Sequence, residues 1–223
     1  MREAKKFEEL KYLISYPENF DRKEKYPLVI FLHGAGTRGD NLDLVSNNAC
    51  FQNLVKRQSE RGYVVLAPQC SGRDWNEFMS YLIGLVDYYR DCEFVDNKRI
   101  YLTGNSMGGY GTWELATIRA GWFAAIMPIC GGGTPWMASN LKNTPIRTFH
   151  GVCDPTVDPT ESLKMVRAVN VCGGNAELIL FPKLAHNCWD EALSDESNYD
   201  WLLSHSLEGE GDGGENLSGK NFG

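Results

Sequence analysis

The order of apolar and polar positions along the chain predicts strands that alternate with helices. Two continuous apolar runs, 28–32 (LVIFL) and 63–67 (YVVLA), are typical of strands at the centre of a parallel sheet, where both faces are covered. Residues 76–92 instead carry apolar side chains at helical spacing, which predicts a long amphipathic helix. This alternation indicates an α/β protein with a doubly wound, mostly parallel sheet.

The remaining elements follow the same alternation. Further strands are predicted at 8–16, 99–103, 123–129, 145–150 and 176–181, and further helices at 51–61, 109–120, 135–142, 160–170 and 189–205. The polar segment 37–48 is predicted to be a loop. A chain of 223 residues without internal repeats is of ordinary size for one domain, so we expect a single domain over residues 1–206.

The last residues of the chain differ in composition from the rest. Residues 207–223 (LEGEGDGGENLSGKNFG) are rich in glycine and acidic residues and nearly free of large apolar ones. Such a segment cannot bury enough apolar surface to order its backbone, so a flexible tail is predicted there. We assign this tail no function.

Charge and composition narrow the possible functions. The chain is 43% hydrophobic and 23% charged, as in ordinary globular proteins, and its net charge is −7. Because Lys and Arg are not clustered, neither nucleic acid nor an anionic membrane is expected as a partner. The N-terminal segment MREAKKFEELKYLIS lacks the apolar core of a signal peptide. This indicates a cytoplasmic protein, or a secreted one if an export signal has been removed.

Cysteine usage gives no sign of a metal or disulfide scaffold. The seven cysteines are an odd number and lack paired C-x-x-C spacing, which disfavours both a full disulfide framework and a structural zinc site. Most are expected to be small buried apolar side chains. No metal and no other cofactor is predicted.

The strongest chemical signal lies in residues 99–112, RIYLTGNSMGGYGT. This segment predicts a strand, a turn with the G-x-S-x-G spacing of Gly104, Ser106 and Gly108, and a helix. A tight strand-to-helix turn exposes the serine hydroxyl to a base, and glycines permit close approach of the backbone. Ser106 is therefore the candidate nucleophile. The Met107 N–H, at the helix start, is expected to face the substrate oxyanion.

Two more polar residues follow predicted strands in the same way. Asp154 comes four residues after the strand that ends at 150, and His186 comes five residues after the strand that ends at 181. Open α/β sheets place their sites beyond the carboxyl ends of the strands, so we expect Ser106, Asp154 and His186 to converge. The chain order Ser, Asp, His is that of an α/β-hydrolase triad.

The motifs around these residues resemble the α/β-hydrolase superfamily. Within it they are similar to the dienelactone hydrolase and phospholipase/carboxylesterase group, which includes predicted peptidases and acetyl-xylan or feruloyl esterases. The matching segments are LVIFLHGAGTRGDN (28–41), APQC (67–70), GNSMGGYGTW (104–113), FHGVCDPTV (149–157) and AHNCWDEA (185–192). The resemblance implies an α/β-hydrolase fold. Dienelactone hydrolases proper use a cysteine nucleophile, so Ser106 argues against that particular activity.

The resemblance also implies roles for the acid and the oxyanion hole. Asp154 occupies the acid position of the H-G-x-x-D segment. Asp158 is a rival acid, because it stands where the family usually has proline, but it is expected to cap the next helix. The glycines of the H-G-A-G segment let the loop turn so that the Ala35 N–H is expected as the second oxyanion donor, beside Met107, with the N–H groups of Gly34 and Gly36 as the alternatives.

The base is assigned to His186 both by motif and by elimination among four histidines. His33 and His150 directly precede glycines at strand ends, where they are expected to fix turns. His205 lies near the predicted tail. His186 would accept the proton of Ser106, and Asp154 would orient the imidazole.

Substrate contacts are less defined by the sequence. Trp75 and Trp189 lie in predicted loops near strand ends and are candidate substrate-binding residues, although aromatic side chains are more often part of a core. Arg38 and Asp40 either bind a substrate carboxylate or pair with each other, and pairing is the expectation.

The spacing of the triad limits the size of any cap. Ser106 and Asp154 are 48 residues apart and Asp154 and His186 are 32 apart, which leaves no room for a helical cap domain. The site should therefore be shallow and open, which suits small or extended esters.

These observations predict a cofactor-independent serine esterase that forms an acyl-enzyme intermediate. Its expected substrates are short-chain or carbohydrate-linked esters. A serine peptidase of the same fold and a non-catalytic binding protein that kept the fold are the alternatives. No oligomeric state is predicted.

Overall fold

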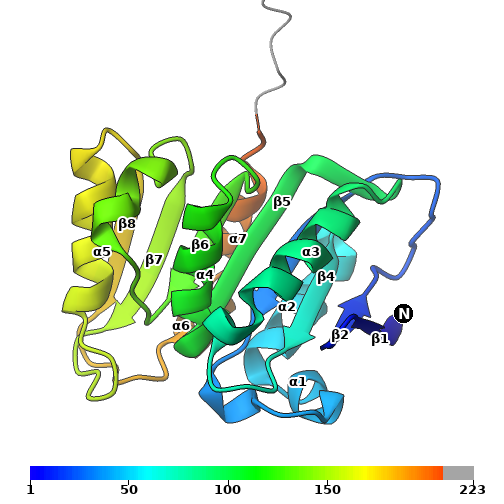
Figure 1. The fold of residues 1–223 in the computed structure, drawn as a ribbon, viewed down its shortest axis with the longest axis horizontal. Helices are drawn as coiled ribbons and strands as arrows, with labels where there is room; N and C mark the ends of the chain where they lie inside the picture. The colour runs from blue at the N-terminus through cyan, green and yellow to red at the C-terminus, as the bar shows by residue number, and fades with distance from the viewer. Residues whose placement is uncertain (208–223) are drawn as a thin grey trace, which may run out of the picture.

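The computed structural model describes residues 1–207, which form one eight-stranded sheet with helices on both faces (Figure 1). The strands are β1 (Arg2–Phe7), β2 (Leu10–Ser15), β3 (Tyr26–Leu32), β4 (Val64–Gln69), β5 (Val95–Asn105), β6 (Ala125–Ile129), β7 (Ile146–Gly151) and β8 (Ala176–Phe181). The helices are α1 (Leu42–Ser46), α2 (Ala49–Arg61), α3 (Met79–Arg90), α4 (Met107–Ile118), α5 (Thr160–Val171), α6 (Trp189–Ser194) and α7 (Glu196–Leu203), with 3₁₀ helices η1 (Ala35–Thr37), η2 (Trp75–Phe78) and η3 (Pro135–Leu141). None of the described helices is long and apolar enough to cross a membrane. Except for Leu207, the predicted tail lies outside the described residues.

The strand order is β1-β2-β4-β3-β5-β6-β7-β8. From β4 to β8 all neighbours are parallel, whereas β2 pairs antiparallel with both β1 and β4. The predicted doubly wound, mostly parallel sheet is therefore confirmed. Between β6 and β7 the described chain forms only η3, and no cap domain covers the sheet.

Each face of the sheet buries its own apolar layer. Leu28, Ile30 and Leu32 of β3 point into the layer under α3, α4 and α5, whereas Val29 and Phe31 point into the layer under α2, α6 and α7 (Figure 1). Successive strand residues face opposite sides, so a strand covered on both faces must be apolar at every position. This explains why 28–32 is an unbroken apolar run.

Three segments differ from the sequence prediction. A single strand is predicted over 8–16, but the chain forms the hairpin β1–β2, in which the edge strand β1 alternates exposed and half-buried residues and so carries no apolar signal. The predicted loop 37–48 contains the short helix α1. The predicted helix 189–205 is two helices, because Asp195 has an extended backbone and caps α7 through a hydrogen bond from the Ser197 N–H (2.9 Å).

The seven cysteines are all free thiols. Four of them are fully buried, as expected for small apolar side chains: Cys50, Cys70, Cys130 and Cys188. Cys153 and Cys172 are exposed instead.

Helix α4 begins in direct contact with the backbone of the sheet. A Cβ at Gly108 would overlap the carbonyl of Leu32 in β3, and a Cβ at Gly104 would overlap the carbonyl of Gly108. Both obstacles are main-chain atoms, which cannot move aside as a flexible side chain can. Only glycine therefore lets α4 start this close to β3 and β5.

Replacing Gly108 with Ala should destabilise the fold by about 3 kcal/mol or more, because neither α4 nor β3 can retreat without disturbing the parallel ladder. Gly121→Ala is the matched control, since Gly121 has a φ of +80° but open space around it. That control should lose only about 1 kcal/mol, the backbone penalty alone. Chemical denaturation of both variants measures the difference, and equal losses would contradict the prediction.

Candidate active site

Ser106 lies on the sharp turn that joins β5 to α4. Its φ of 56° and ψ of −118° are unusual for a residue with a side chain. Hydrogen bonds hold the turn on both sides: the Ser106 N–H donates to the carbonyl of Ile129 in β6 (2.9 Å), and the Ser106 carbonyl accepts from the Tyr110 N–H (3.0 Å). The hydroxyl is thereby held at the carboxyl end of the sheet.

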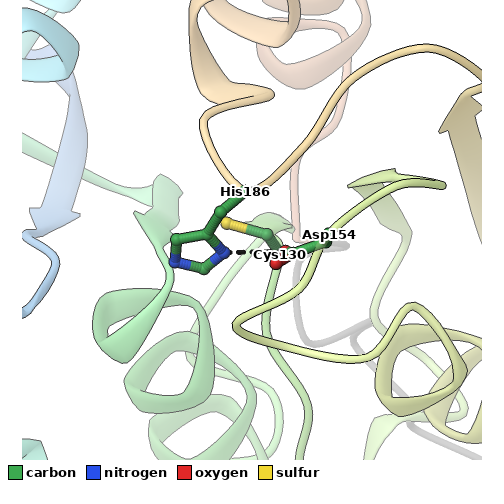
Figure 2. A group of neighbouring side chains, drawn as sticks. All are labelled: Cys130, Asp154 and His186. Carbon is green, nitrogen blue, oxygen red and sulfur yellow. Dashed lines mark hydrogen bonds and ion pairs between the residues drawn. The ribbon is translucent and has the colours of Figure 1, made fainter.

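The structure brings Ser106, His186 and Asp154 together. His186 Nε2 lies 2.8 Å from Ser106 Oγ, and His186 Nδ1 lies 2.7 Å from Asp154 Oδ2. Figure 2 shows the imidazole facing the carboxylate. An ionised carboxylate only accepts hydrogen bonds, so the proton of the neutral imidazole is on Nδ1. Nε2 is then free to accept the hydroxyl proton of Ser106.

The Asp154 side chain is fully buried, whereas the His186 side chain is 21% exposed. Asp154 Oδ1 accepts hydrogen bonds from the backbone N–H groups of Thr156 (2.8 Å) and Val157 (3.0 Å). Burial would raise the pKa of Asp154, but the hydrogen bonds from His186 and from the two backbone groups outweigh it and lower the pKa. The carboxylate is therefore ionised at neutral pH.

Asp158, the rival acid, does not join this group. It is exposed, and its carboxylate accepts a hydrogen bond from the Thr160 N–H (2.8 Å) at the start of α5. Asp158 thus hydrogen-bonds the first residue of α5, as expected, but from one position before the N-cap residue, which is Pro159.

Two helices that begin next to Ser106 carry the candidate oxyanion donors, the N–H groups of Ala35 and Met107. Ala35 is the first residue of η1 and Met107 is the first residue of α4. N–H groups in the first turn of a helix have no partner within that helix. Ala35 lines the same cavity as Ser106. The positions of Ala35 and Met107 are thus compatible with an oxyanion hole.

Arg38 fastens this loop from outside. Its Nε donates to the Ala35 carbonyl (3.0 Å) and its Nη1 donates to the Arg73 carbonyl (2.9 Å). The expected pairing of Arg38 with Asp40 is wrong, because Asp40 pairs with Lys11 at 2.6 Å instead. The contacts of Arg38 and the Lys11–Asp40 pair all lie at the surface. The Arg38 guanidinium donates to backbone carbonyls of two adjacent loops.

His33 is a buried structural residue of the same loop. Its Nδ1 lies 2.7 Å from the Gly34 carbonyl, and its Nε2 lies 3.0 Å from the Cys70 N–H. A carbonyl can only accept and an N–H can only donate, so the ring is neutral with its proton on Nδ1. Burial lowers the pKa of His33 to about 4. His33 joins the ends of β3 and β4, which confirms its expected role in fixing the turn.

A cavity of about 430 Å³ opens beside Ser106. It is lined by residues 34–37, 48–50, 105, 106, 156, 186 and 189. None of these described lining residues is Asp, Glu, Lys or Arg. The cavity therefore offers a neutral surface in which His186 is the ionisable group closest to Ser106.

The two tryptophans singled out by the sequence lie in different environments. Trp189 lines the cavity with its ring edge-on to His186, at 5.5 Å between the centroids. Trp75 is only 1% exposed, and its indole N–H donates to the His33 carbonyl (3.1 Å). This corrects the expected substrate contact of Trp75, whose ring turns inward because Gly111 of α4 leaves room for it. Trp189 stays a candidate contact.

The side chains of Cys130, Asp154 and His186 form a compact group (Figure 2). Their potential ligand atoms all lie within 4.8 Å of one another. However, His186 Nδ1 already donates to Asp154, and the neighbouring Cys188 thiol, together with burial, raises the pKa of Cys130. A metal would require a thiolate and an unprotonated nitrogen, so this donor set fits a metal poorly.

The chain belongs to the alpha/beta hydrolase family, whose model matches residues 29–198. A solved structure described as a thermostable esterase superimposes with a TM-score of 0.81 at 30% identity, covering 92% of this chain and 63% of that one. A probable feruloyl esterase C of Aspergillus terreus is 26% identical over 160 residues, covering 69% of this chain and 58% of that protein.

Peptidases are also among the relatives. A dipeptidyl-peptidase 5 of Porphyromonas endodontalis is 22% identical over 224 residues, covering 78% of this chain but only 32% of that protein. The chain thus spans less than two thirds of the length of these curated relatives. Family and fold agree with the resemblance seen in the motifs.

The buried neutral state of His33 should make the fold sensitive to acid. Between pH 6.5 and about 4 the unfolded chain takes up a proton on this imidazole that the native state excludes, so the free energy of unfolding falls as the pH is lowered. The two pKa values correspond to a loss of about 3 kcal/mol from this residue. In His33→Asn, this part of the acid sensitivity should disappear.

Denaturation of wild type and His33→Asn at pH 8 and pH 4.5 measures the effect. At pH 8 the imidazole is neutral in both states, so any deficit of the variant there reports lost hydrogen bonds and lost packing against Trp75, not protonation. The gap between the two proteins should narrow on acidification, and a constant gap would contradict the prediction.

Proposed function

We propose that this protein is a serine esterase in which Ser106, His186 and Asp154 form the catalytic triad. The proposal is carried by one observation: the imidazole of His186 bridges Ser106 Oγ and Asp154 Oδ2 at 2.8 and 2.7 Å. A hydroxyl, a base and an orienting acid linked in this way are what nucleophilic acyl transfer requires.

In the first half of the reaction, Ser106 Oγ attacks the ester carbonyl carbon while His186 Nε2 takes its proton. The negative charge that develops on the carbonyl oxygen is stabilised by the N–H groups of Ala35 and Met107. His186 then returns the proton to the leaving alcohol, and an acyl-enzyme is left on Ser106. Throughout, Asp154 holds Nδ1–H and stabilises the imidazolium.

In the second half, water takes the place of the alcohol. His186 removes a proton from the water, which attacks the acyl carbon, and the proton then passes to Ser106 as the acid is released. The same two N–H groups stabilise the second oxyanion. All residues needed for both halves come from this chain.

An esterase is favoured over a dipeptidyl peptidase by the cavity. A free peptide amino terminus is a cation, and a buried cation needs a carboxylate partner. The described lining contains no Asp or Glu. The cavity instead suits a neutral group, and Trp189 provides an apolar wall next to the reacting atoms.

The size and openness of the site suggest the substrate class. No cap covers the described sheet, and the cavity of about 430 Å³ holds a short or a single-ring acyl group rather than a long chain. A bulky alcohol, such as a sugar, can extend into solvent. We propose short-chain or carbohydrate-linked esters as substrates, in line with the feruloyl esterase among the relatives.

Substitution of the triad should abolish turnover of p-nitrophenyl acetate. Ser106→Ala should lower kcat by about 10⁴-fold or more, since the nucleophile is lost. Asp154→Asn should lower kcat by about 10²- to 10⁴-fold, because an amide can donate to Nδ1 and so favours the wrong tautomer. A fluorophosphonate probe should label Ser106, as located by mass spectrometry.

Asp158→Asn is the matched control for the acid. It makes the same chemical change four residues away, on an exposed carboxylate that accepts the Thr160 N–H, and should retain activity within about twofold. Wild-type turnover in Ser106→Ala, or no labelling of the wild-type protein, would refute the esterase proposal.

The neutral cavity should discriminate against charged acyl groups. We expect kcat/KM for the mono-p-nitrophenyl ester of succinate to be at least about tenfold lower than for p-nitrophenyl butyrate, because a carboxylate would be buried without a partner. The control is the methyl p-nitrophenyl diester of succinate, whose acyl group is uncharged and slightly longer than that of the mono-ester. Equal rates for the acid and its methyl ester would contradict the neutral-cavity argument.

A further inference from the structure

One buried imidazole next to the triad has no part in the steps above. His150 lies near the end of β7, and its side chain is fully buried. Its Nε2 lies 2.9 Å from the Val157 carbonyl and 3.2 Å from Asp154 Oδ2. Asp154 Oδ2 is the same oxygen that faces His186 Nδ1 at 2.7 Å. The carboxylate oxygen therefore lies between two imidazole rings.

The neighbours of His150 place a hydrogen on its Nε2. Nε2 faces only acceptors, the Val157 carbonyl and the Asp154 carboxylate, so it must carry a hydrogen. Nδ1 lies 2.8 Å from the hydroxyl of Ser162 in α5, and this hydroxyl lies 2.7 Å from the Gly131 carbonyl. His150 thus connects the triad acid to α5 and to the segment after β6.

These contacts hold the turn that carries the acid from two directions. Asp154 Oδ1 accepts the Val157 N–H, while His150 Nε2–H donates to the carbonyl of that same Val157. One contact restrains the N–H of Val157 and the other restrains its carbonyl, so the turn cannot rotate without breaking one of these hydrogen bonds. The hydrogen bond of Nε2–H goes to Val157, and the same nitrogen lies 3.2 Å from Asp154 Oδ2, so His150 bears on both the turn and the charge of the acid.

We propose that His150 is a positioning residue of the triad: its Nε2–H orients the Asp154 turn and draws part of the carboxylate charge away from His186. This inference rests on the proposed esterase function and deepens it. His150 touches no substrate in this arrangement and acts on Ser106 only through Asp154 and His186. His150 therefore affects both the position of Asp154 and the strength of its interaction with His186.

Other ionisable groups also surround this network and bear on any pH effect. They are Asp158 on the same loop, Glu161 on α5, Tyr110 on α4, Cys130 after β6, and His186 with Cys188 after β8. Of these groups only His186 is hydrogen-bonded to Asp154 Oδ2 in the described residues, and His150 lies on the other side of that oxygen. Removing the His150 donor should therefore change the interaction between Asp154 and His186 directly.

Two variants of similar polarity separate this role from simple packing. In His150→Gln the side-chain amide nitrogen reaches the position of Nε2 and keeps a donor to the Val157 carbonyl close to Asp154. In His150→Asn it reaches only the position of Nδ1, so the contact with Ser162 is kept and the contact with the acid is lost. Circular dichroism and denaturation establish that both are folded.

We expect His150→Asn to lower kcat for p-nitrophenyl acetate by about 10- to 100-fold with KM nearly unchanged, the size of effect seen when a hydrogen-bonded support of a functional imidazole is removed. His150→Gln should stay within about fivefold of wild type. In His150→Asn the acidic limb of the kcat/KM profile should also move to higher pH by roughly half a unit, because the carboxylate then stabilises protonated His186 more strongly.

His205→Asn, the same change in a histidine remote from the site, is the control and should match wild type. The proposal is overturned if His150→Asn and His150→Gln have equal kcat, or if kcat falls in His150→Asn while the acidic limb stays in place. Failure of the underlying esterase function is distinguishable, because wild-type protein would then neither turn over the ester nor react with a fluorophosphonate at Ser106.

Discussion

The whole site depends on how closely the backbone of α4 approaches the sheet. Gly104 and Gly108 bring the end of β5 and the start of α4 within van der Waals contact of each other and of the Leu32 carbonyl. Only a turn this tight places Ser106 at positive φ with its hydroxyl clear of the main chain. Such a backbone costs about 1–2 kcal/mol, and the surrounding hydrogen bonds and packing must offset it.

Around this turn, buried side chains hold the loops through hydrogen bonds made on the side away from the cavity. Much of the cavity lining is therefore made of small residues. His33 and Trp75 fix the loop after β3 through hydrogen bonds to main-chain atoms, and His150 does the same for the loop after β7. Parallel strands end at one edge of the sheet, so these loops lie next to each other without any long insertion. Because the buried side chains lie beneath the loops, the lining itself can be short, neutral and open to substrate.

Much of this arrangement could be predicted from the sequence, because apolar periodicity and turn chemistry are local signals. The buried strands and the strand-turn-helix at Ser106 are examples. Predictions failed where long-range contacts decide: the edge strand β1 shows no apolar alternation, and Trp75 is buried because Gly111 lies opposite to it. The contact of His150 with Asp154 also depends on a turn whose geometry the spacing does not reveal.

The chemistry of the acid explains why its partners are arranged as they are. A buried carboxylate is costly unless each oxygen is hydrogen-bonded, and two of the contacts to Asp154 are N–H groups of its own turn. These groups and the buried His150 do not need to move while substrate is converted to product. His186, with its partly exposed side chain, is then the ionisable side chain that contacts the acid and also lines the cavity. The proton is therefore transferred by His186, whose ring is partly exposed, while the carboxylate charge of Asp154 that orients this ring stays fixed in the interior.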